Sequence, residues 1–338
     1  MSITRAEVEL AYRLLLGRQP ENEAAYEYGL SAGSVETLRR WIMDGFEFAD
    51  VIKQEVPLGL RRWMLAEQRE RQEAEQQEGG EGAEEGGPPR IVFIHIMKTA
   101  GTSVRKRLEE LLPGERFWRR EVDGKHGNFP VSALLPYRCF TDHINFADAL
   151  HVPRPRRIFT VLRDPHARVV SLYHFLARHR AEFLAERQLN EARIARECSL
   201  LEFLRRPEPV IRAAVQNTMT CTLAGDYTPI GSNLYVTPWG SRADAISGTE
   251  LLRLALANLR KIDFVTSVER LEQDRPRLMA TLGLPDPGPF ARHNTRDFVN
   301  VVVEPRPEPE VTEEVRTELN RLTELDRMLV RLAKLDVM

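Results

Sequence analysis

Two short apolar runs, each followed by a polar loop and then a helical pattern, constrain the fold of this 338-residue chain most strongly. The first is RIVFIHI (residues 90–96), followed by KTAGTS and VRKRLEELL; the second is RIFTVL (157–162), followed by RDP and a helical pattern over 166–177. Uninterrupted apolar runs of this length are typical of strands buried on both faces, and strand–helix alternation favours a parallel sheet. The sequence therefore predicts an α/β fold, with further strands over residues 137–141 and 263–268.

The sequence predicts that the chain has three consecutive parts. Apolar residues at helical spacing stop at Gly17, and two more helical patterns follow at about 21–30 and 35–43, so residues 1–65 predict a small all-helical module. The Glu/Gly-rich stretch up to Pro89 has no apolar side chain larger than alanine, and residues 66–89 predict a flexible acidic linker. Residues 90–338 form the predicted α/β domain, with one long amphipathic helix expected over 310–335.

Composition excludes several classes of protein. The chain has 48 Lys plus Arg against 50 Asp plus Glu, a net charge of −2, which argues against a general nucleic-acid-binding surface. Three cysteines far apart, with no CxxC pair, predict neither a disulfide framework nor a zinc site. No apolar stretch approaches the roughly 20 residues of a membrane span, and the first residues do not resemble a secretory signal. We therefore expect a cytoplasmic protein.

The strongest chemical motif is HIMKTAGTS, residues 95–103, placed between a predicted strand and helix. Backbone N–H groups at such a junction lack intrahelical partners and attract anions. Lys98 adds a positive charge, Thr99, Thr102 and Ser103 offer hydroxyls, and the small Ala100 and Gly101 admit a phosphate. The alternative is that Thr102 merely caps the helix and Lys98 is solvated. The motif is not Walker A, because Lys98 precedes Gly101 rather than following a second glycine.

Two segments of the chain, FIHIMKTAGTS and LRDPHARVVSLY, resemble the sulfotransferases. The resemblance is to the carbohydrate branch that includes the heparan 2-O-sulfotransferases and bacterial relatives, whose signatures are HxPKTGGTS and LRDPxxRxxSxY. Met97 stands where that family usually has proline, and Ala100 where it usually has glycine. The resemblance implies a P-loop-like parallel sheet flanked by helices. It also implies 3′-phosphoadenylyl sulfate as donor, without a required metal.

The resemblance assigns roles to particular residues. It implies that residues 98–103 hold the 5′-phosphosulfate, that Arg163 and Ser171 hold the 3′-phosphate, and that Lys98 stabilises the leaving phosphate. His143, in CFTDHINF, is similar to the family's GHxxF histidine, which serves as base. His126 and Asp142 are further candidates for the acceptor site, and which of the three removes the acceptor proton stays open. The expected acceptor is a glycan or another hydroxyl-bearing small molecule.

Other interpretations stay open at this stage. A nucleotide-dependent kinase with an atypical phosphate loop and a non-catalytic nucleotide-binding scaffold are the two rival functions. Residues 292–295 (RHNT) either close over the nucleotide or are a solvated loop, and the basic patch at 154–157 (RPRR) either receives an anionic glycan or is solvated surface. The helical module either docks a partner or is an inert cap. No nucleic-acid partner is expected.

Overall fold

The computed structural model describes residues 3–16, 18–43, 87–118, 131–186, 189–237, 240–290 and 302–333. The chain divides into two compact units, Met1–Glu78 with Trp239–Asp244 and Gly79–Pro238 with Ala245–Met338. No helix in the described ranges is both long and apolar enough to cross a membrane.

The N-terminal segment is helical, as predicted. It contains α1 (Arg5–Leu16), α2 (Glu23–Ser31) and α3 (Val35–Met43), which pack around the fully buried Val8 and Leu38. Asn22 caps α2, because its side-chain oxygen accepts a hydrogen bond from the Ala25 N–H at 3.0 Å. Residues 44–65 of the predicted module and 66–86 of the predicted linker lie outside the described residues.

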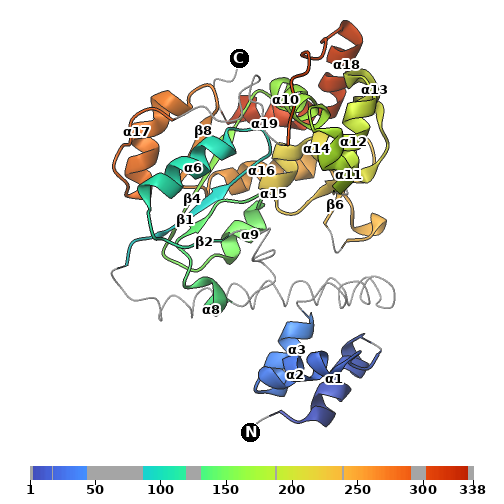
Figure 1. Cartoon of the computed structure of the whole chain (residues 1–338), viewed down its shortest axis with the longest axis vertical. Helices are drawn as coiled ribbons and strands as arrows, with labels where there is room; N and C mark the ends of the chain where they lie inside the picture. The colour runs from blue at the N-terminus through green and yellow to red at the C-terminus, as the bar shows by residue number, and fades with distance from the viewer. Residues whose placement is uncertain are drawn as a thin grey trace. The chain divides into compact units, whose positions relative to one another are not determined.

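A five-stranded, all-parallel sheet forms the centre of the second unit (Figure 1). This confirms the predicted α/β fold. The strand order is β2-β3-β1-β4-β8, which places β1 between β3 and β4. The sequence pattern did not predict β2, which is only two residues long. The strand bounds are β1 Arg90–Ile94, β2 Phe117–Trp118, β3 Cys139–Phe140, β4 Arg156–Leu162 and β8 Phe264–Ser267.

Helices cover both faces of the sheet because the central strands are apolar on both sides. Ile91 and Phe93 of β1 pack in a cluster with α6 (Gly101–Leu111) and α17 (Leu271–Leu282). Val92 and Ile94 pack on the opposite face, in a cluster with α9, α15 and α16. All four side chains are fully buried, and each burial contributes about 1.5–3 kcal/mol. The helices of the second face are α9 Phe146–His151, α15 Thr218–Ala224 and α16 Gly248–Leu259.

A third apolar cluster is built around α10 (Pro165–Ala177), the helix that follows β4. Asp164 caps this helix by accepting a hydrogen bond from the Ala167 N–H at 2.7 Å, and Pro165 occupies its first turn. The remaining elements are α8 Val131–Leu134, α11 Ala181–Glu186, α12 Asn190–Glu197, α13 Leu200–Arg205, α14 Pro209–Val215, and an antiparallel sheet of β5 Thr228–Pro229, β6 Leu234–Val236 and β7 Ile246–Ser247.

The prediction of one long C-terminal helix is wrong. The chain forms α18 (Glu313–Leu322) and α19 (Glu324–Leu332), which meet at the buried Thr323. The Thr323 hydroxyl donates to the Leu319 carbonyl at 2.7 Å, and the side-chain oxygen of Asn217 accepts from the Leu325 N–H at 2.9 Å. The break is therefore stabilised by a residue about a hundred positions away, which a local pattern does not reveal.

Candidate functional site

The loops after β1 and β4 meet at the carboxyl edge of the sheet. The two strands are parallel neighbours, with Ile94 paired to Thr160, so the segments that follow them emerge side by side. The Arg163 guanidinium donates a hydrogen bond to the Lys98 carbonyl at 3.0 Å. The structure thus brings together the two segments that the sequence analysis singled out, at the place where open α/β sheets usually bind ligands.

The loop of Lys98 has the backbone shape of an anion-binding nest. Lys98 (φ 69°) and Ala100 (φ 64°) both adopt the left-handed region, whereas Thr99 between them does not. Such alternation turns successive N–H groups towards one concave side. Helix α6 begins immediately afterwards at Gly101, and the N–H groups of its first turn have no acceptor within the helix. Nest and helix dipole together favour an anion here.

The threonines and serine of the loop have different roles. Thr99 is fully buried and its hydroxyl donates to the Ile96 carbonyl at 2.8 Å, so this hydroxyl holds the loop closed instead of facing an anion as expected. Thr102 does not cap α6, because the capping position is Ala100 and no side-chain cap is present. Thr102 and Ser103 lie in the first turn of the helix and are half-buried.

Lys98 is a half-buried cation among other cations. Its ammonium nitrogen lies 4.2 Å from the centre of the Phe175 ring on α10. Burial, together with the nearby charges of Arg163 and Arg178, lowers the pKa of Lys98 to about 8. Lys98 is therefore mostly protonated at neutral pH, and a bound anion would stabilise that charge further. The sequence analysis missed Arg178, which is buried and donates from Nε to the Glu304 carbonyl at 2.8 Å.

The second motif divides into groups at the site and groups in the core. Ser171 is half-buried on α10, about 9 Å along the helix axis from Pro165. Arg168 is fully buried instead, and its Nη2 donates to the Ala214 carbonyl and the Thr218 hydroxyl, both at 3.1 Å. Arg168 therefore ties α10 to the neighbouring helices, while Arg163 contacts the Lys98 loop.

His143 is held in one tautomer by the backbone of β1's loop. Its Nδ1 lies 2.9 Å from the His95 carbonyl oxygen, and the two imidazole rings stack with centroids 4.2 Å apart. Because a carbonyl can only accept, Nδ1 carries the proton, and Nε2 is the nitrogen of the neutral ring that bears the acceptor lone pair. The His143 side chain is exposed. This is the arrangement that a general base at an open site needs.

The His95 ring stacks against the His143 ring and fixes its position. The His95 ring stacks between Phe93, at 5.3 Å, and His143. Burial, together with the charges of His143, Arg105 and Lys98, lowers the pKa of His95 well below its ordinary 6.5, so this ring is neutral. A Cβ on Gly101 would lie 1.7 Å from His95 Nε2, which is why only glycine fits at that position. Gly101 was expected only to admit a phosphate, and its packing against His95 was not predicted from the sequence.

Of the two other candidates for the acceptor site, the structure describes Asp142 but not His126. Asp142 is buried, and its carboxylate lies 3.8 Å from the Arg105 guanidinium on α6, whereas the hydrogen bond at His143 Nδ1 goes to His95. His126 and the loop 292–295 lie outside the described residues. Across the described ranges no group of three His, Cys, Asp or Glu side chains could hold a metal ion.

Comparison with models of known protein families gives no match to this chain, and no curated protein matches it significantly. The function proposed below therefore rests on the residues themselves.

Proposed function

We propose that this protein transfers a sulfuryl group from 3′-phosphoadenylyl sulfate to a hydroxyl of an acceptor, most simply a carbohydrate, in the cytoplasm. The observation that carries the proposal is the hydrogen bond from Arg163 to the Lys98 carbonyl. This bond holds the anion-binding nest next to the planar guanidinium of Arg163, which is suited to bind a second phosphate, within one site. A donor with anionic groups at both ends of one nucleotide matches that pairing.

The residues present fit such a donor. The N–H groups of residues 98–103 and the Lys98 ammonium suit the phosphosulfate end, while Arg163 and Ser171 suit the 3′-phosphate end. When bound, the donor supplies the sulfuryl group and a phosphate leaving group. The Arg163 guanidinium carries five N–H donors in a planar fork whose geometry matches a phosphate, and one of these donors is bonded to the Lys98 carbonyl.

Lys98 and His143 have complementary tasks in the proposed transfer. The Lys98 ammonium stabilises the negative charge that develops on the leaving phosphate oxygen, an effect strengthened by its partial burial. His143 Nε2 accepts the proton of the acceptor hydroxyl as that oxygen gains the sulfuryl group. The His95 carbonyl then stabilises the imidazolium through the hydrogen bond at Nδ1.

The test is nucleotide discrimination by the full chain in the presence of a chelator. Calorimetric titration should show adenosine 3′,5′-bisphosphate binding at least about tenfold more tightly than adenosine 5′-monophosphate, because Arg163 holds the extra phosphate. Arg163→Lys should remove this preference, since an ammonium lacks the planar fork. Tighter, magnesium-dependent binding of ATP would instead support a kinase.

Turnover distinguishes an enzyme from a scaffold. The full chain is incubated with the sulfate donor and a panel of hydroxyl-bearing saccharides, and release of adenosine 3′,5′-bisphosphate is followed. We expect acceptor-dependent release in chelator. Bisphosphate binding without release, for every acceptor in a broad panel, would favour a non-catalytic module.

A further inference from the structure

The amino edge of the sheet, opposite to Lys98, is lined with cations. A basic residue stands at or just before the start of each of the five strands. Because the strands are parallel, all these residues gather at one edge. Arg156 and Leu162, at the two ends of β4, are about 20 Å apart, so this edge is separate from the site proposed above. The five residues are Arg116, Arg138, Arg90, Arg156 and Lys261, in the order of the strands across the sheet.

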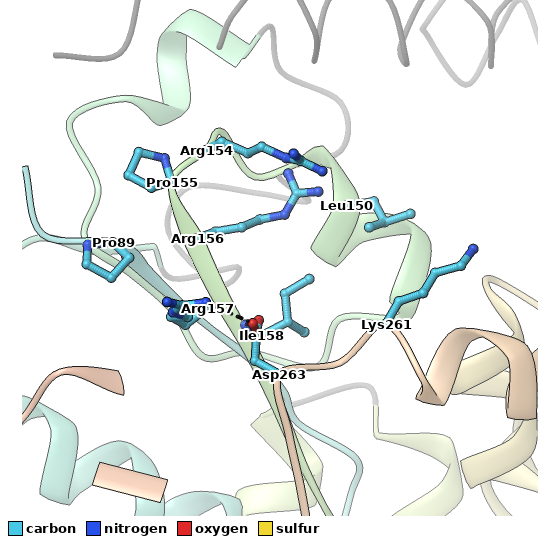
Figure 2. A pocket seen from close by; sticks show the side chains of 9 residues that line it. All are labelled: Pro89, Leu150, Arg154, Pro155, Arg156, Arg157, Ile158, Lys261 and Asp263. Atoms are coloured by element: carbon cyan, nitrogen blue, oxygen red, sulfur yellow. Dashed lines mark hydrogen bonds and ion pairs between the residues drawn. The ribbon is translucent and has the colours of Figure 1, made fainter. Parts of the chain in front are cut away.

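A cavity of about 590 Å³ opens at this edge (Figure 2). In Figure 2, Arg154 and Arg156 extend side by side towards Leu150, and Lys261 lies below Leu150. Asp263 is the one acidic residue of the lining. Its carboxylate is already engaged by the Arg157 guanidinium at 3.2 Å and the Ile158 N–H at 2.7 Å. The cavity therefore presents an excess of positive charge.

These cations stand close to one another, and their like charges outnumber the one neighbouring carboxylate, Asp263. Burial and the charge of Arg154 lower the pKa of Arg156 to about 10, and burial and the charge of Arg138 lower the pKa of Arg90. The ion pairs recorded among the described residues include none for Arg154, Arg156 or Lys261. Like charges packed in this way repel, and a bound anion would relieve the repulsion.

Buried guanidinium N–H groups without hydrogen-bond acceptors also favour a bound anion at this edge. Arg138 is nine-tenths buried, and its Nε and Nη1 have no hydrogen-bond partner. Nε of Arg90 is also buried without a partner, while its two terminal nitrogens donate to the carbonyls of Arg154 and Leu135. Arg90 thus connects the segment of Arg154, before β4, to the turn that follows α8. Orphaned guanidinium donors of this kind are costly unless a ligand completes them.

We propose that this amino edge binds an acidic polysaccharide, with carboxylates or sulfates on successive sugars. Adjacent strands lie about 4.8 Å apart, so Arg138, Arg90 and Arg156 form a row of donors that suits repeated anionic groups. The described residues that line the cavity include no aromatic ring on which nucleobases could stack, and the net charge of the chain is −2. Both facts favour a saccharide over a nucleic acid. The proposal is independent of the chemistry at the carboxyl edge.

The test uses the full chain and an end-labelled hexasaccharide of polygalacturonic acid, with fluorescence anisotropy as the measurement. We expect binding that weakens with salt, and no binding of a neutral hexasaccharide. Arg154→Glu and Lys261→Glu change exposed side chains, so folding should be preserved. Each should weaken binding about tenfold and both together about a hundredfold. Arg193→Glu, an exposed charge reversal on α12, is the matched control and should leave binding unchanged.

Several results would overturn the proposal. Equal binding by the wild type and the double variant would place the saccharide elsewhere. An oligothymidylate of matched charge that binds more tightly, and is lost in the same variants, would assign the edge to nucleic acid. Inorganic phosphate that binds as tightly as the hexasaccharide would leave only a site for small ions. Nucleotide binding at Lys98 is measured in the same variants and should not change, which separates failure here from failure of the sulfuryl-transfer proposal.

Discussion

The two edges of one parallel sheet both collect cations, but they hold them differently. At the carboxyl edge, Arg163 and Arg178 each donate to a backbone carbonyl, and Lys98 sits in a loop with two left-handed residues. At the amino edge, Arg90 also donates to backbone carbonyls, but Arg154 and Lys261 are exposed residues that line an open cavity.

This difference indicates different kinds of binding. Fixed donors on a strained, closely packed loop select one small ligand in one orientation, as group transfer requires. A row of cations that includes exposed side chains selects charge and its spacing, and tolerates variation in the rest of the ligand. Changes at the carboxyl edge should therefore have large, specific effects, and changes at the amino edge should have graded ones.

The largest effect is expected from Lys98→Ala. Removing the ammonium removes the stabilisation of the leaving phosphate, and the transfer rate should fall about 10³-fold. Lys98→Arg keeps the charge but not the compact geometry, and should retain part of the rate. The measurement is release of adenosine 3′,5′-bisphosphate with saturating donor. A fall of less than about threefold for Lys98→Ala would show that Lys98 has no role in the chemical step.

His143→Asn is expected to lower the transfer rate about 10²-fold while nucleotide affinity stays constant. The asparagine amide can still donate to the His95 carbonyl, so the local structure is preserved, but the basic Nε2 is lost. The pH–rate profile should lose its acidic limb in this variant. Retention of that limb would assign the base to another group, and Asp142→Asn would then be tested in the same assay.

Gly101→Ala should lower the affinity for adenosine 3′,5′-bisphosphate about thirtyfold. The new Cβ would lie 1.7 Å from His95 Nε2, and overpacking of this kind costs about 2 kcal/mol. Gly87→Ala, close to the amino edge in sequence, is the matched control, because a Cβ there meets nothing within 4 Å. Calorimetric titration of both variants with adenosine 3′,5′-bisphosphate shows whether only the tightly packed glycine matters for nucleotide affinity. Equal affinities would mean that His95 moves aside without disturbing the loop.

Raising the pH should weaken nucleotide binding but not saccharide binding. The ammonium of Lys98, with a pKa of about 8 in the free protein, is lost as pH rises through that value, so affinity should fall about tenfold from about pH 7 to about pH 9. Arg156, with a pKa of about 10, stays charged over that range. In Lys98→Arg the decline should disappear. A wild-type affinity that stays flat would show that the Lys98 charge does not contact the nucleotide.

The sequence predicted the fold where the signal was local. β1 and β4 are long apolar runs and were found. The two-residue β2 leaves no periodic signal, and the antiparallel strands β5 to β7 have only two or three residues each. The division between α18 and α19 was missed because its cap comes from Asn217, remote in sequence. Long-range partners of this kind do not appear in a local pattern.

The sequence predicted which loops form the site, but it did not predict how the side chains in those loops pack. That residues 98–103 and Arg163 meet follows from two parallel strands being neighbours. The inward turn of the Thr99 hydroxyl and the bond from His143 to the His95 carbonyl depend on side-chain packing, which residue spacing does not fix. The amino-edge row depends on strand order, which places Arg138 beside Arg90 although the two are far apart in the chain.

The smallest effect is expected from Ala100→Gly, which measures the backbone strain of the loop at the carboxyl edge. A left-handed alanine costs about 1–2 kcal/mol, and glycine removes that cost while adding about 0.5–1 kcal/mol of unfolded-chain entropy. The net gain in the free energy of unfolding should be about 0.5 kcal/mol, seen as a higher urea midpoint with an unchanged slope. Ala185→Gly, on the exposed side of α11, should lower stability by a similar amount because its backbone is helical. If both substitutions destabilise equally, the nest around Lys98 stores no strain, and its selectivity has to come from the charges alone.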